Sequence, residues 1–133
     1  MNLLVATLIA WIAIHAGLQA PEPPRIVQVR AEQIAAMTDN TANPEAVYVY
    51  DERTIYFPNT WSSDNLRDRA TLVHELAHHV LKMNNVRAPC ERAYEAEAYR
   101  LEFEWLREQG ITDPYKFLDT NALAIILRSA CRD

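Results

Sequence analysis

The chain has 133 residues, half of them hydrophobic, and a formal net charge of −5. This length suits one domain with its own core rather than two, and the hydrophobic content argues against extended disorder. The acidic balance argues against a nucleic-acid-binding protein, which needs a basic face. The only glycines are Gly17 and Gly110, so a glycine-rich phosphate-binding loop is absent.

The first twenty residues form a segment of distinct composition. Residues 3–18 are almost entirely apolar, and this length suits the core of a signal peptide better than a full transmembrane span. Ala16 and Ala20 are small enough for a signal peptidase, but no Lys or Arg precedes the run and Pro21 follows it. We expect residues 1–20 to be a signal peptide or an N-terminal membrane anchor, with a buried core helix as the alternative. The protein is then exported (periplasmic or secreted), or associated with a membrane through residues 3–18.

A proline-rich linker, PEPP at residues 21–24, follows this segment because consecutive prolines cannot lie inside a helix. We expect residues 25–133 to form a single domain. It begins with strand character at residues 25–29 and a short helix at residues 31–37. The turn-forming TDNTANP, residues 38–44, ends that helix.

The remaining pattern predicts a hairpin followed by helices. Two β-rich runs within residues 46–57 flank a three-residue loop and predict two antiparallel strands. Three further segments have helical spacing: one capped by Ser62 or Ser63 and running to about Lys82, one from about Glu91 to Gln109 with Gly110 as its stop, and the C-terminal NALAIILRSA. The expected fold class is α+β, with a small antiparallel sheet and helices.

The central helix carries the sequence His74-Glu75-Leu76-Ala77-His78. Residues four apart project from one face of a helix, so His74 and His78 can present two imidazole nitrogens to one metal ion. Glu75 is rotated away from direct ligation, but it stays close enough to accept a proton from a metal-bound water. Imidazole and carboxylate ligands that leave one position for water suit Zn²⁺. The pattern therefore predicts a hydrolytic zinc site.

A third protein ligand is expected from the following helix. Glu91, Glu95 and Glu97 lie within its first two turns. Glu95 and Glu97 point about 200° apart, so only one of them can face the metal, and spacing alone leaves the choice open. Glu102 and Glu104 lie further along and are expected to face solvent.

The stretch LVHELAHHV, followed by a glutamate on the next helix, resembles the gluzincin class of HExxH zinc metallopeptidases. Over residues 47–106 the order of elements is similar to that of compact ImmA/IrrE-like members. The resemblance implies a zincin-like peptidase domain that hydrolyses peptide bonds, with Glu75 as the catalytic base. The Glu97-Ala98 pair matches the ligand helix of that family and gives the third-ligand role to Glu97; Glu95-Ala96 is also such a pair, so Glu95 is the backup.

Several further side chains could contribute to such a site. His79 is expected to be exposed rather than a ligand, and Trp61 to be a buried anchor. The residue types that could stabilise an oxyanion include the tyrosines, among which the sequence does not choose: Tyr48, Tyr50, Tyr56, Tyr94 and Tyr99. An extended substrate is expected to pair with the hairpin edge near residues 54–57.

Cys90 and Cys131 are the only cysteines. In an exported protein an even count favours a disulfide, and their spacing has no CxxC metal pattern.

Taken together, the sequence predicts a zinc-dependent peptidase that acts on a peptide or protein substrate. The alternative is a non-catalytic zinc-binding or partner-binding protein on a peptidase scaffold.

Overall fold

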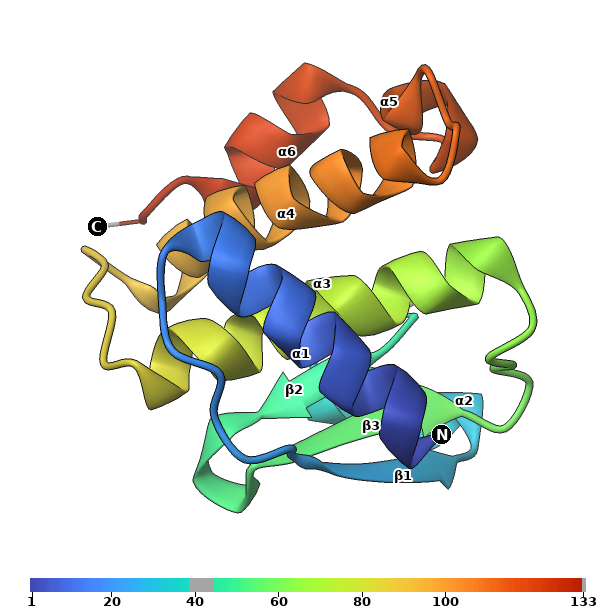
Figure 1. Cartoon of the computed structure of the whole chain (residues 1–133). Helices are drawn as coiled ribbons and strands as arrows, with labels where there is room; N and C mark the ends of the chain where they lie inside the picture. Colours follow the sequence, from blue (N-terminus) through green and yellow to red (C-terminus); the bar gives the residue numbers. More distant parts are fainter. Residues whose placement is uncertain (39–44, 133) are drawn as a thin grey trace.

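The structure, a computed structural model, describes residues 1–38 and 45–132 and has the predicted α+β class (Figure 1). The predicted turn over residues 38–44 falls, except for Thr38, outside the described residues. The elements follow one another in the order α1 (Asn2–Ala16), β1 (Arg25–Val29), α2 (Ala31–Met37), β2 (Val47–Val49), η1 (Tyr50–Glu52), β3 (Thr54–Pro58), α3 (Leu66–Met83), η2 (Glu91–Ala93), α4 (Tyr94–Glu108), α5 (Pro114–Phe117) and α6 (Ala122–Ser129).

Among the described residues the sheet has three strands, with β3 between β1 and β2. β2 and β3 form the predicted antiparallel hairpin, joined through η1 and Arg53, whose φ is 48°. β1 pairs with β3 in parallel, so the prediction of a purely antiparallel sheet is wrong. Because β3 has a neighbour on each side, the expected pairing of a substrate beside residues 54–57 is also wrong. An unpaired edge of the described sheet belongs instead to β2.

Helix α3 lies at the centre of the core, between the sheet and α4 (Figure 1). Its amphipathic spacing buries a long apolar face that includes Leu72, Val73, Leu76 and Val80, all fully inaccessible. The N-cap is Asn65 rather than a serine, because the Asn65 side chain accepts a hydrogen bond from the Asp68 backbone N–H at 3.0 Å. The packing of α3 therefore fixes the direction in which His74 and His78 project.

Helix α4 packs against α3 and runs antiparallel to it (Figure 1). It buries Ala98, Leu101 and Leu106. The chain then turns at Gly110, whose φ of 93° belongs to the left-handed region, and the Ile111 N–H donates to the Leu106 carbonyl at 3.0 Å. The predicted stop at Gly110 therefore agrees with the end of α4.

Helix α1 packs on α3 and α4 and belongs to the core. Leu8, Ile9 and Ile12 are at most 4% exposed, and the Trp11 indole N–H donates to Glu108 at 3.1 Å. Helix α1 is thus the buried core helix that the sequence analysis gave as the alternative to a signal peptide or membrane anchor. None of the helices in the described ranges has both the length and the apolar character needed to cross a membrane.

A disulfide joins Cys90 to Cys131, with 5.8 Å between their Cα atoms. It ties the segment before η2 to the end of α6. Helix α6 has no buried residue of its own, so this bond and contacts with α4 and η2 hold it on the domain.

Candidate metal centre

The two histidines of α3 meet one glutamate of α4. His74, His78 and Glu95 each offer one ligand atom, and these atoms lie within 4.8 Å of one another. The Glu95 Oε1 atom lies 3.4 Å from His74 Nε2 and is in direct contact with His78 Nε2. This cluster could hold a metal ion, because two imidazoles and a carboxylate converge on one point.

The structure brings Glu95 to the histidines and leaves Glu97 away from them. Glu97 lies on the other face of α4, where it accepts a hydrogen bond from Arg100 Nε at 2.7 Å. Glu91, the third candidate, pairs with Lys82. The geometry therefore places Glu95, the backup candidate, and not Glu97 in the cluster that could hold a metal ion. The physical reason is rotation: two helix positions turn the side chain by about 200°.

Glu102 supports the cluster from behind. Its Oε1 atom lies 2.9 Å from His74 Nδ1, and both residues are buried, at 4% and 7% exposure. The expectation that Glu102 faces solvent is wrong. A proton on Nδ1 donated to Glu102 leaves the Nε2 lone pair directed at the cluster, which is the usual arrangement behind a metal-ligating histidine. The sequence signal was present, since Glu95 and Glu102 are two helical turns apart and share a face.

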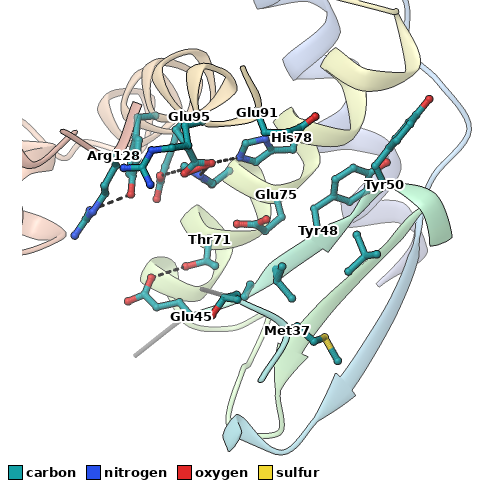
Figure 2. Close-up of a pocket in the computed structure, with 18 of the residues that line it drawn as sticks. Met37, Glu45, Tyr48, Tyr50, Thr71, Glu75, His78, Glu91, Glu95 and Arg128 are labelled. Carbon is teal, nitrogen blue, oxygen red and sulfur yellow. Dashed lines mark hydrogen bonds and ion pairs between the residues drawn. The ribbon is translucent and has the colours of Figure 1, made fainter. Parts of the chain in front are cut away.

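Glu75 lies beside the two histidines with only 9% of its surface exposed. Its carboxylate lines the same pocket as His74 and His78, and in Figure 2 it lies between Glu95 and Tyr48. Burial raises the pKa of Glu75, against the opposing effect of the neighbouring histidines. No hydrogen bond or ion pair engages this carboxylate within the ranges that the structure describes.

The cluster groups also perturb one another. Burial alone would lower the pKa of His74, but the hydrogen bonds to Glu102 and Glu95 outweigh it and raise the pKa well above its usual value. Burial would raise the pKa of Glu95, yet the two histidines hold it below the usual range. Without a metal, the Glu95 carboxylate is therefore ionised and faces the two histidines, and a cation that bound here would compete with protons for the ligand atoms.

A pocket of about 1680 Å³ opens in front of the cluster. β2, with Tyr48, lines one side, and residues of α4 and α6, including Tyr99 and Arg128, line the other. Figure 2 shows Tyr48 on the strand side and Arg128 on the helix side. The unpaired edge of β2 thus borders the pocket that contains the histidines.

Among the candidate tyrosines, Tyr99 contacts the cluster directly: its ring packs edge-on against His74, with 4.5 Å between ring centroids. Tyr48 instead bonds His79, with 2.7 Å between its hydroxyl and Nδ1, and burial raises the pKa of Tyr48 to about 12. His79 Nε2 reaches the Glu22 carbonyl at 2.7 Å. At 1% exposure His79 is buried, so its expected exposure is wrong, and it ties β2 to the linker before β1.

Trp61 has the expected position as a buried anchor. It is 7% exposed, packs on Phe57 with 4.5 Å between ring centroids, and donates its indole N–H to the Asp68 carbonyl at 2.8 Å. These contacts fix the loop that leads into α3.

The fold and the cluster define an α+β domain with a candidate metal centre. The family described as "Domain of unknown function (DUF6647)" matches residues 1–133, and the chain belongs to this family. No curated protein and no solved structure matches the chain. The family match includes α1, so this helix is part of the domain that the family shares.

Proposed function

We propose that this protein is a zinc-dependent metallopeptidase. The observation that carries the proposal is the position of Glu75, a largely buried residue beside the two histidines whose carboxylate makes no hydrogen bond within the described ranges. Its oxygens are open to the pocket, since among the described residues only Thr120 Oγ1 is an inaccessible side-chain polar atom without a partner. A metal site that only joins two helices has no need of a free carboxylate there, whereas hydrolysis needs a base at this place.

The donor set supports zinc as the metal. His74, His78 and Glu95 would supply two imidazole nitrogens and one carboxylate oxygen, and the pocket leaves the remaining side open. Glu102 would hold the His74 ring and its tautomer through the 2.9 Å contact. When bound, zinc would polarise a peptide carbonyl and lower the pKa of a water in its open position.

The residues of this chain then have separate roles. Glu75 accepts the proton of the attacking water and passes it to the leaving amine, a role that its raised pKa suits. The unpaired edge of β2 offers backbone donors and acceptors to an extended peptide. A peptide placed along β2 would run past Glu75, because both line the same pocket.

The proposal is tested on the full chain, since α1 supplies part of the core. Zinc content and cleavage of a mixed peptide library are measured for the wild type and for Glu75→Gln. We expect about one zinc per chain in both, with cleavage reduced by at least about a hundredfold in the variant. Arg100→Gln, on the opposite face of α4, is the control and should cleave normally.

The two other outcomes are distinct. Stoichiometric zinc without cleavage of any library peptide would favour the alternative, a non-catalytic zinc-binding or partner-binding protein on a peptidase scaffold. Failure to bind zinc would contradict both readings.

We further propose that the protein is exported, because the Cys90–Cys131 disulfide suits an oxidising compartment. Thiol labelling of the protein in intact cells of its source tests this. Two unreactive cysteines that become reactive only after reduction support export, and two reactive thiols contradict it.

A further inference from the structure

Some of the cations that line the pocket are paired with carboxylates, and others are not. Arg67 pairs with Glu45 at 3.0 Å, and Lys82 pairs with Glu91. Three further arginines line the pocket near η2 and α6, namely Arg92, Arg128 and Arg132. None of these three forms an ion pair with a carboxylate among residues 1–38 and 45–132. The pocket therefore has three arginine side chains near α6 that no described carboxylate pairs with.

Two of these arginines have hydrogen-bond partners that differ in kind. Arg92 donates to the carbonyls of Ala130 and Leu127, at 3.0 Å and 2.8 Å, so its guanidinium is engaged in holding the end of α6. Arg128 donates one N–H to the Tyr99 hydroxyl at 3.0 Å. Its remaining donors make no other hydrogen bond with the described part of the chain.

Tyr99 links Arg128 to the candidate metal centre. Its ring lies against His74, and its hydroxyl accepts from Arg128, so the guanidinium is one side chain away from the cluster. Figure 2 shows Arg128 on the helix side of the pocket, with a dashed line for its hydrogen bond to Tyr99. Because the Tyr99 oxygen accepts from Arg128, its own O–H is free to donate to a group in the pocket.

An anion of suitable shape would receive hydrogen bonds from both residues. A phenol keeps its proton at neutral pH, so the Tyr99 O–H can act as a donor. The guanidinium of Arg128 offers further N–H groups in a planar fork that matches a carboxylate. A peptide has two sources of this chemistry, its C-terminal carboxylate and the side chains of Asp and Glu.

We propose that Arg128 and Tyr99 form a subsite that binds a carboxylate of the peptide substrate next to the metal centre. The inference rests on the proposed function for its substrate, but the binding itself needs no hydrolysis. The subsite would select peptides that place a carboxylate at a fixed distance from the bond over the cluster.

Binding is measured with the zinc-loaded Glu75→Gln protein, so that no peptide is consumed. The probes are N-acetylated random hexapeptide pools without acidic residues, prepared with a C-terminal carboxylate or a carboxamide. Two further carboxamide pools carry one fixed Glu or one fixed Gln. Equilibrium dialysis with mass spectrometry gives the ratio of bound acid to bound amide in each pair.

At least one pair should show a preference for the carboxylate of about fivefold or more, the size expected for a partly exposed charged contact. The pair that shows it identifies the source of the carboxylate. Arg128→Gln and Tyr99→Phe, each added to Glu75→Gln, should reduce this preference, while zinc content stays unchanged. Arg100→Gln is the matched control, since it removes the same charge outside the pocket and should retain the preference.

Equal binding of both members of each pair, or a preference that survives Arg128→Gln, would overturn the subsite. A preference that Arg128 controls in a protein whose wild type cleaves no peptide would retain the subsite and reject the proposed hydrolysis. If the wild type cleaves peptides and Arg128→Gln lowers kcat equally for every pool without changing binding, the residue acts on the transition state and the subsite is overturned.

Discussion

The Nδ1 atom of His74 lies 2.9 Å from Oε1 of Glu102, inside the contact between α3 and α4. Both side chains are buried, so this pair is shielded from competing water. The contact fixes the orientation of the His74 ring and directs Nε2 towards His78 and Glu95. A carboxylate that orients a histidine in this way is typical of the outer contacts of metal centres.

Replacing Glu102 by Gln should weaken zinc binding while leaving the three ligands in place. We expect the affinity to fall about ten- to hundredfold, because the loss of the carboxylate lowers the basicity of His74 and loosens its ring. Competition with a chromogenic chelator measures the affinity. Glu104→Gln is the control, since Glu104 faces away and pairs with Arg100. Equal affinities in the two variants would mean that Glu102 has a structural role only.

The third ligand can be decided by a matched pair of variants on α4. Glu95→Ala should lower the affinity for zinc by more than the roughly hundredfold expected for a residue that only supports a ligand, because it removes a ligand atom of the cluster. Glu97→Ala should bind zinc like the wild type, since its partner is Arg100. The chelator competition applies again, and the reverse order of effects would restore Glu97 as the ligand.

Local spacing accounts for the part of the site that was predictable. An i, i+4 pair on a helix must share a face, so His74 and His78 come together in any fold that keeps α3 helical. The stop at Gly110 and the hairpin around residues 50–53 follow equally local rules.

The errors concern how elements lie against one another. The rotation of α4 about its axis decides between Glu95 and Glu97, and the buried stripe of Ala98, Leu101 and Trp105 sets that rotation. This stripe is visible in the sequence. The resemblance of the Glu97-Ala98 pair to the family's ligand helix instead favoured Glu97, which lies on another face of α4. The parallel pairing of β1 with β3 and the burial of His79 against Glu22 join residues far apart in the chain, and local patterns do not contain that information.

Helix α1 should contribute to the stability of the purified full chain. Ile12 is fully buried against the core, so Ile12→Ala should cost about 2–5 kcal/mol of unfolding free energy. Ile14 is 76% exposed on the same helix, and Ile14→Ala should stay within about 0.5 kcal/mol of the wild type. Denaturant unfolding measures both, and equal small effects would mean that α1 does not dock in solution.

The disulfide should stabilise the domain and the position of α6. The two cysteines are 41 residues apart, and closing a loop of this length is worth about 4 kcal/mol in the unfolded-chain model. The double variant Cys90→Ser, Cys131→Ser should lose up to that amount in denaturant unfolding. Zinc affinity should persist, because the ligands lie on α3 and α4. The preference for peptides with a carboxylate should fall, because α6 and its Arg128 are no longer held in place. Loss of zinc in a folded double variant would contradict this separation.

His79 should make the stability of the protein fall in mild acid. Burial lowers its pKa below the usual 6.5, against a smaller opposing effect of the Glu22 carbonyl. A histidine with a lowered folded-state pKa stays neutral in the fold while the unfolded chain takes up a proton. Its contribution to stability is therefore fully present above the unfolded pKa and is lost as the pH falls through the folded value.

Unfolding of the wild type and of His79→Gln is compared with chelator present, from about pH 7.5 to about pH 5. The cluster groups titrate in both proteins and cancel in the difference, so the wild type should lose more stability than the variant over this interval. Parallel pH profiles would mean that His79 takes up its proton in the folded protein as readily as in the unfolded chain, and that its contacts with Tyr48 and Glu22 do not depend on the neutral ring.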